Sequence, residues 1–309
     1  KVLLMSIADD LEELSNVDKH ISAIKLANLT YLDEDDTRTL AETWPEIDVT
    51  RRLHIITDLT ELAEDNVELN FASVFKVALS DEEPLVRAAA IRGLFEYEQR
   101  DLIGVLIDLM LTESDAGVRR EAAIALGRFA LAAELGELGE ADAFAIRDAL
   151  IESAEDIEED ERVRARAIEA LGAMSGDDTD NLIESIYEED SLWLKVGAID
   201  AMGRSCNATW LPIIMREMEH RAPEMRHAAA FAAGEIGEEE AVPWLKRMAV
   251  EDPDREVRVV AVRALGAIGG SKARIALQNV LYEGDDSLQD AIGEALEEIA
   301  FNDDPLGSL

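Results

Sequence analysis

The stretch Val257–Gly266, Val-Arg-Val-Val-Ala-Val-Arg-Ala-Leu-Gly, decides the fold because close copies of it recur through the chain. In chain order the other copies begin at Val86, Val118, Val163, Leu194, Met225 and Leu288. From Val163 onward, successive copies begin 31 or 32 residues apart. A fixed period of this size is the signature of stacked structural repeats.

Each repeat contains a second apolar segment ahead of the quoted phrase, as in Leu102–Leu111, Asn181–Tyr187 and Val242–Met248. Two helices of about three turns, joined by short turns, account for the period. Such a helical hairpin cannot bury its own apolar face, so neighbouring hairpins must stack. The sequence therefore predicts an all-α, right-handed α-solenoid of about nine hairpins.

The repeats differ in regularity along the chain. We predict regular repeats over residues 80–309 and degenerate N-terminal helical repeats over residues 1–79, in one continuous solenoid. The interval from Val118 to Val163 is 45 residues, so one repeat is expanded near residues 128–162. We expect the extra residues in the loop Leu135–Asp142 and in the acidic turn at residues 155–161.

The turns and helix ends carry two further patterns. Acidic residues fall in the turns, where a carboxylate can cap the next helix and complement its dipole; they include Asp81, Asp115, Asp160, Asp190, Asp252 and Asp285. A glycine ends most copies of the phrase, where we expect it to adopt the positive φ of a helix C-terminus; these glycines are Gly127, Gly172, Gly203, Gly234 and Gly266.

The assembled pattern, a turn Asp followed by an apolar residue, Arg or Lys, two alanines and Leu-Gly, resembles HEAT repeats, particularly the short type of the phycobilisome lyases. The resemblance implies that turn Asp and phrase Arg residues pair into a structural ladder: Asp115 with Arg119, Asp160 with Arg164 and Asp254 with Arg258. It says little about function, since HEAT-like arrays serve as adaptors, cargo receptors, lyase subunits, hydroxylases and DNA glycosylases.

The charge balance narrows the range of partners. The chain has 68 acidic and 29 basic residues, a formal net charge of −39. Such a field repels phosphate backbones and anionic lipids, so we expect no nucleic acid and no membrane partner. A protein or peptide partner of basic character fits the charge. The same acidity is also typical of proteins adapted to high salt, and this alternative stays open.

The four histidines lack the neighbouring residues that a metal site of the HEAT-repeat class requires. The hydroxylases of the HEAT-repeat class hold two irons with adjacent His and Glu residues, and the surroundings of His227 resemble that site. Ala228 stands where the glutamate would be required, however, and His20, His54 and His220 have no adjacent glutamate either. We therefore expect no metal site.

Cofactor and nucleophile motifs are absent as well. The sequence contains no phosphate-binding glycine loop, no paired-histidine zinc motif and no EF-hand loop, so we expect no cofactor. Cys206, the single cysteine, has no histidine within ten residues to activate it. One cysteine, no run of about 18 apolar residues and no signal-peptide layout predict a cytoplasmic protein.

Helical geometry locates the candidate binding surface. Counted from the first apolar residue of each phrase, positions 0, +4, +7 and +8 share the core face, while positions +2 and +6 point away from it. In HEAT-type solenoids the second helix lines the concave side, so positions +2 and +6 are expected to line a groove that is apolar in its middle. Trp193, one residue before a phrase, either anchors a partner or packs on the preceding repeat. The candidate residues are Arg92, Arg120, Ile124, Glu169, Trp193, Val196, Asp200, His227, Phe231, Val259 and Arg263.

From the sequence we thus expect a non-enzymatic scaffold or adaptor whose concave groove binds a basic protein segment or helix. The alternative is an accessory subunit of a chromophore-lyase-like or other modifying enzyme.

Overall fold

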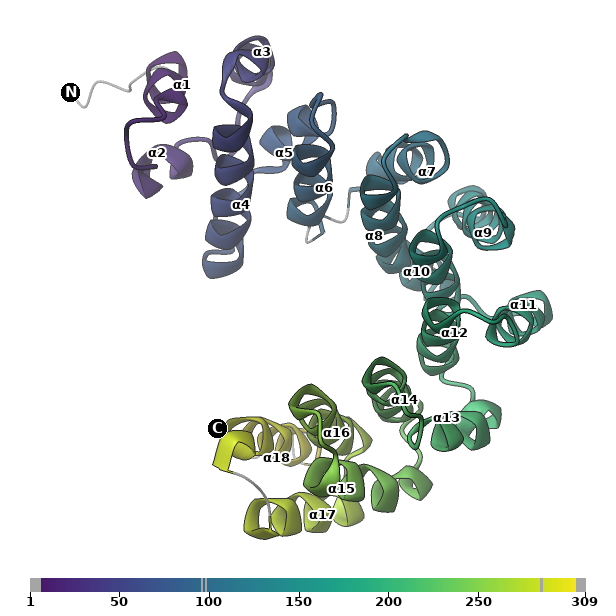
Figure 1. Cartoon of the computed structure of the whole chain (residues 1–309). Coiled ribbons are helices and arrows are strands. Elements are labelled where there is room, and N and C mark those ends of the chain that lie inside the picture. Colours follow the sequence, from purple (N-terminus) through teal and green to yellow (C-terminus); the bar gives the residue numbers. More distant parts are fainter. Residues whose placement is uncertain (1–6, 96, 98, 284–285, 304–309) are drawn as a thin grey trace. The chain divides into compact units, whose positions relative to one another are not determined.

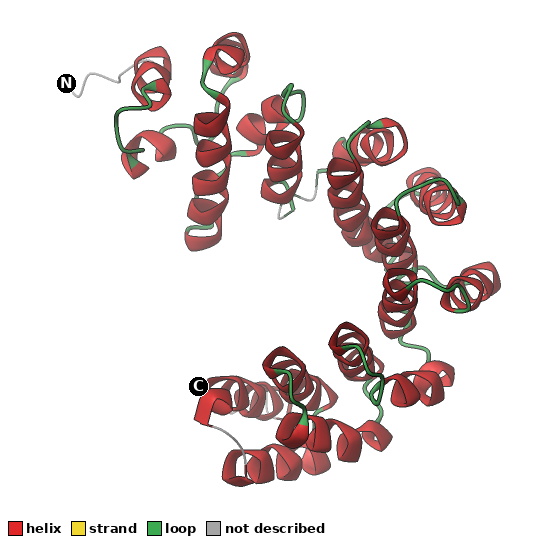
Figure 2. Ribbon diagram, in the orientation of Figure 1, coloured by secondary structure: helices red, strands yellow, loops and turns green. Residues whose placement is uncertain are grey.

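The chain is built from helices and turns in the computed structural model, which describes residues 7–95, 97, 99–283 and 286–303. Within these residues there are eighteen α-helices and no strand, as Figure 2 shows by colour. The helices pair into nine hairpins, so the expected all-α solenoid of about nine hairpins is confirmed. Residue contacts divide the chain into two compact units, residues 1–129 and 130–309.

Unit 1 holds the first hairpins, and its second helices α4 and α6 pack against each other (Figure 1). Its helices are α1 (Ile7–Ser15), α2 (Ala23–Ala27), α3 (Glu34–Thr43), α4 (Val49–Asp65), α5 (Ala72–Ala78), α6 (Pro84–Gly93), α7 (Leu102–Thr112) and the first part of α8 (Ala116–Glu134). Residues 7–79, where the sequence predicts degenerate helical repeats, thus contain five α-helices, α1 to α5. Residues 1–6 of that predicted region lie outside the described residues.

Unit 2 stacks its hairpins so that the second helices α10, α12, α14, α16 and α18 lie side by side in one row (Figure 1). Its second helices are α10 (Glu161–Leu171), α12 (Leu192–Arg204), α14 (Pro223–Ile236), α16 (Arg255–Ile268) and α18 (Gln289–Asp303). Its first helices are α9 (Glu140–Glu155), α11 (Asp177–Tyr187), α13 (Leu211–Glu217), α15 (Val242–Glu251) and α17 (Gly270–Glu283). Short 3-10 turns precede several helices.

The core stripe predicted from the helical period is buried. In α16, Val257, Ala261, Ala264 and Leu265 occupy positions 0, +4, +7 and +8, and each is at most 4% exposed. Burial of these apolar side chains between hairpins supplies the main stabilisation of the stack.

The expectation that the phrase glycines adopt positive φ is wrong. Gly203, Gly234 and Gly266 lie inside helices, and Gly172 caps α10 with a φ of −55°. The positive-φ helix ends lie three residues farther on, at Gly237 (φ 78°) and Gly269 (φ 68°).

The phrase glycines instead let successive second helices approach closely. A Cβ atom built on Gly203 of α12 would lie 2.6 Å from the Cα of Ala232 in α14. The same collision would occur between Gly234 and Ala264, where the distance to Cα is 2.9 Å. Only glycine opposite alanine allows backbones so close, which explains the small residues of the repeat.

The arginine ladder exists, but its partners differ from the expected ones. Arg226 makes a bidentate ion pair with Asp252 of the following repeat, at 2.7 and 2.8 Å. Equivalent pairs to an acid of the following turn are Arg52 with Asp81, Arg87 with Glu113, and Arg164 with Glu189. The ladder therefore ties neighbouring repeats together.

The turn aspartates of the expected pairs have a different partner. Asp160 accepts a hydrogen bond from the N–H of Arg162, and Asp254 accepts from Glu256 and Val257. These contacts are helix N-caps, as the acidic turns predict. Asp285 lies outside the described residues.

The extra residues near 128–162 lie in helices and not in loops. Helix α8 has 19 residues and α9 has 16, whereas the connections at residues 135–139 and 156–160 are short. The expected long loop over Leu135–Asp142 is therefore wrong, because Glu140 already begins α9.

The close helix approach can be tested with alanine. Gly203→Ala should lower the free energy of unfolding by about 1–3 kcal/mol because the new methyl group meets the backbone of α14. Gly293→Ala in α18 is the matched control: a methyl group added there would meet no atom within 4 Å, so helix propensity should raise stability by up to about 1 kcal/mol. Urea unfolding measures both, and equal effects would contradict the packing role.

The ladder predicts a pH dependence of stability. Burial raises the pKa of Glu113, but hydrogen bonds from Arg87, Ser114 and the N–H of Asp115 outweigh it and bring the pKa to about 2. Since this value lies below the ordinary 4.5, the stabilisation is present above pH 4.5 and is lost as the pH falls toward 2.

Glu113→Gln should therefore destabilise the chain by about 1.5–3 kcal/mol at pH 7, and the difference from the parent should shrink between pH 4.5 and 3. Urea titrations at these pH values provide the measurement. Glu42→Gln, at an exposed position of α3, should change stability by less than about 0.5 kcal/mol. A deficit for Glu113→Gln that stays constant with pH would refute the assignment.

Candidate functional site

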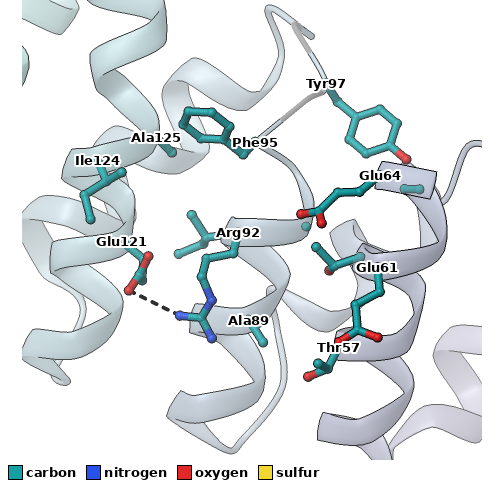
Figure 3. A pocket seen from close by; sticks show the side chains of 14 residues that line it. Thr57, Glu61, Glu64, Ala89, Arg92, Phe95, Tyr97, Glu121, Ile124 and Ala125 are labelled. Atoms are coloured by element: carbon teal, nitrogen blue, oxygen red, sulfur yellow. Dashed lines mark ion pairs between the residues drawn. The ribbon is translucent and has the colours of Figure 1, made fainter. Parts of the chain in front are cut away.

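A pocket of about 330 Å³ opens in unit 1 between α4, α6 and α8 (Figure 3). Arg92 lies at its centre, with its guanidinium Nη1 3.2 Å from a carboxylate oxygen of the buried Glu121. Glu61 and Glu64 project from α4 on the other side of the pocket. Neither of them makes a hydrogen bond or ion pair with a described residue.

Apolar groups complete this unit 1 pocket. The guanidinium of Arg128 stacks on the ring of Phe95, 4.7 Å from the ring centroid. Phe95 is nevertheless 39% exposed. Ile124 stands on α8 and is 37% exposed. The pocket thus combines apolar walls with the carboxylates of Glu61 and Glu64, which pair with no cation in the described part of the chain.

A second pocket, of about 500 Å³, lies in unit 2 between α10, α12, α14 and the start of α16. We call it the Asp200 pocket, after a carboxyl that projects from α12. Glu169, on the neighbouring helix α10, is bound by Arg166 and by Arg204, whose Nη2 lies 2.6 Å away. Asp200 itself forms no hydrogen bond or ion pair with a described residue.

The surroundings of Asp200 favour its neutral form. Burial raises its pKa most, the nearby Glu169 raises it further, and Arg166 and Arg204 oppose them. The result is a pKa of about 7, against an ordinary 3.8. A carboxyl with such a pKa changes charge near neutral pH and often marks a functional site.

Aromatic residues line the Asp200 pocket. The guanidinium of Arg162 lies 4.5 Å from the ring centroid of Trp193, which is 36% exposed. Trp193 therefore both packs on the preceding repeat and faces the pocket. Phe231 and His227 contribute from α14. Burial lowers the pKa of His227, although Glu256 and Asp254 act in the opposite direction.

An adjoining pocket of about 450 Å³, the Arg263 pocket, shares His227, Phe231 and Glu256 with the Asp200 pocket. It is completed by α16 and α18, and Glu294 and Glu298 add carboxylates to its wall. Acidic groups thus extend along the second helices of unit 2.

The structure brings nearly all of the sequence-predicted groove residues to these pockets. Arg92 and Ile124 line the unit 1 pocket; Glu169, Trp193, Val196, Asp200, His227 and Phe231 line the Asp200 pocket; Val259 and Arg263 line the Arg263 pocket. Arg120 lines none of the three and pairs with Glu121 at 3.3 Å.

Two expectations about the groove need correction. Val196 and Val259 were expected to be exposed at position +2, but they are only 8% and 9% exposed because the neighbouring second helices cover them. Sequence reasoning also left out Glu224 and Glu256, which line the Asp200 pocket. Each of them comes one residue before a phrase, as Trp193 does, so aligning the repeats could have predicted that they line the groove.

Two curated enzymes share sequence with this chain. Deoxyhypusine hydroxylase of Cryptococcus neoformans is 34% identical over 109 residues, which is 34% of this chain and 30% of that protein. The Saccharomyces cerevisiae enzyme of the same name is 31% identical over 111 residues, 34% of each chain. The match therefore spans about a third of the length of either relative. Because both relatives are enzymes, the expectation of a non-enzymatic scaffold is contradicted.

The iron chemistry that the resemblance attaches to such hydroxylases does not fit the residues present. His227 is followed by the buried Ala228, and the described residues hold no group of three His, Cys, Asp or Glu side chains placed to bind a metal ion. Across the same residues, no helix is long and apolar enough to span a bilayer.

Structure and sequence agree on the family. The phycocyanin lyase complex of Nostoc has the same fold, with a TM-score of 0.53 and 17% identity over 85% of this chain and 94% of that one. The family model for HEAT repeats matches residues 72–134, 179–249 and 209–297, more than half of the sequence. Together with the Gly–Ala helix contacts and the arginine ladder, these matches show that the chain belongs to the HEAT-repeat family.

Proposed function

We propose that this chain takes part in the enzymatic modification of a cationic side chain on a protein, and that the second-helix surface of unit 2 receives the substrate. The observation that carries the proposal is the row of carboxylates lining the Asp200 and Arg263 pockets beside aromatic walls. A cationic side chain with an apolar stem matches both features.

The curated relatives support the enzymatic part of the proposal. Their name describes hydroxylation of deoxyhypusine, and the resemblance to this HEAT-repeat enzyme class implies a modified lysine as the substrate. A substrate of that kind is positively charged at neutral pH. The proposal extends only the class of substrate to this chain and includes no hydroxylation step, because the described residues do not supply the iron ligands.

The charge of the chain supports the same substrate class. A net charge of −39 attracts basic protein segments over long distances and disfavours phosphate-bearing partners. The exclusion of nucleic acid and membrane, and a cytoplasmic location, remain predictions from the sequence.

The proposal predicts a chemical difference between cells. Proteins from a strain lacking the gene should contain at least one lysine whose mass differs from that in the parent strain. Mass spectrometry of tryptic peptides, searched for unassigned mass shifts on lysine, makes the comparison, and returning the gene should restore the parental mass. Identical lysine masses in the two strains would overturn the proposal.

A binding measurement tests the electrostatic part separately. A pentalysine peptide should bind the purified chain, and its dissociation constant should rise by about tenfold or more between 50 and 300 mM salt because screening weakens exposed charge pairs. Isothermal titration calorimetry measures this, with a pentaglutamine peptide as the neutral control. Equal affinity for the two peptides would contradict the substrate class.

A further inference from the structure

We propose that the Asp200 pocket binds one alkylammonium group, with the Asp200 carboxylate as its counter-ion and the rings of Trp193 and Phe231 as walls for the alkyl stem. The inference deepens the proposed function and takes its class of substrate from it. It adds the group that recognises the cation and the pH range in which recognition operates.

Asp200 differs from the other carboxylate in the centre of the pocket. Glu169 already pairs with two arginines, with Arg204 Nη2 at 2.6 Å, so its negative charge is compensated within the protein. Asp200 has no such partner among the described residues, although it lies partly covered in a pocket of about 500 Å³. An uncompensated carboxylate in a partly buried position is costly, and a bound cation removes that cost.

The walls of the pocket suit an alkyl chain that ends in a charge. Trp193 offers an indole ring that is 36% exposed, and its existing contact with Arg162 shows that this ring already stacks with a cationic group. Phe231 lines the same pocket from α14. Aromatic faces attract ammonium groups and also shield the methylene groups next to them.

The remaining charges around Asp200 come from each helix packed against it. Helix α10 contributes Glu169 and Arg166, α12 contributes Arg204, and α14 contributes Glu224 and His227. The start of α16 adds two more acids, Asp254 and Glu256.

Most of these charged groups already have a hydrogen-bond or ion-pair partner within the protein. Asp254 caps α16, and Glu256 pairs with Arg255 at 2.9 Å. Glu224 makes no ion pair with a described residue and adds negative charge at the pocket edge. The two guanidiniums near Asp200 already bind Glu169. Asp200 and Glu224 are therefore the pocket carboxylates without an ion pair to a described residue, and Asp200 is the one that is partly covered, whereas Glu224 is exposed.

Titration of Asp200 makes binding depend on pH. With a pKa of about 7, the carboxyl is mostly neutral at pH 6.5 and ionised at pH 8.5. If only the ionised form binds the ammonium, affinity should rise about fourfold over this range. Burial lowers the pKa of His227 below its ordinary 6.5, so this imidazole stays mainly neutral throughout.

The test uses N-acetyl-lysine methylamide as the probe, since its single charge is an alkylammonium. N-acetyl-norleucine methylamide has the same stem without the charge. By calorimetry the lysine compound should bind the full chain at pH 8.5 and about fourfold more weakly at pH 6.5. At each pH the norleucine compound should bind at least about tenfold more weakly than the lysine compound.

Asp200→Asn should weaken the lysine compound about tenfold at pH 8.5 and abolish the pH dependence. Asp148→Asn, an exposed aspartate of α9 outside the pocket, should leave both unchanged. Because the folded-state pKa of Asp200 is raised, its charge destabilises the fold as the pH rises from about 3.8 to 7. Asp200→Asn should therefore unfold at the same or a higher temperature at pH 8.5, which separates lost binding from lost folding.

A second variant probes the wall. Trp193→Leu keeps an apolar side chain but removes the aromatic face, so it should weaken the lysine compound several-fold and leave the pH dependence in place. Equal binding of the two compounds, or unchanged affinity in Asp200→Asn, would overturn the inference.

Failure of the inference and failure of the proposed function give different results. Lysine mass shifts that depend on the gene, together with binding that ignores Asp200, refute only the inference. Binding through Asp200 without any gene-dependent mass shift refutes only the enzymatic role.

Discussion

In unit 2, the contact between a glycine of one second helix and an alanine of the next limits which side chains fit along the stacked helices. Gly172, Gly203, Gly234 and Gly266 each face an alanine at a distance that leaves no room for a methyl group. Helices this close bury their small residues completely and leave little space between them for large side chains. The repeat therefore requires small residues along the helix face where neighbouring second helices touch, which we call the seam. Large or charged side chains lie at positions outside this seam.

This confinement explains where the pockets form. Residues at position +6 and just before the phrase lie beyond the seam, which is why Glu169, Asp200 and Trp193 surround a cavity. Residues at position +2, such as Val196 and Val259, lie nearer to the seam and are covered. The same backbone spacing thus produces a buried apolar face and, one helical turn away, a surface where polar and aromatic groups gather.

Carboxylates in the chain fall into two groups by their partners. One group holds the fold: Asp252 and Glu113 bind arginines of the preceding repeat, and Asp160 caps a helix. The other group, to which Asp200 and Glu61 belong, has no partner among the described residues. Negative charge that does not stabilise the fold is available for a ligand, and this availability is the basis of the proposed substrate class.

The sequence by itself determined the helical hairpins, their period and the core face, because these depend on local hydrophobic spacing that repeats along the chain. It also predicted that Glu169, Asp200, Trp193 and Phe231 lie away from the core face, since position within a repeat specifies direction, and in the structure all four line the Asp200 pocket. Tertiary structure decided what the glycines do, which acid each ladder arginine binds, and that Asp200 is without a partner among the described residues while Glu169 has two. Those outcomes depend on distances between helices about one repeat apart in the chain, and a single sequence contains the period of the repeats but not the gap between them.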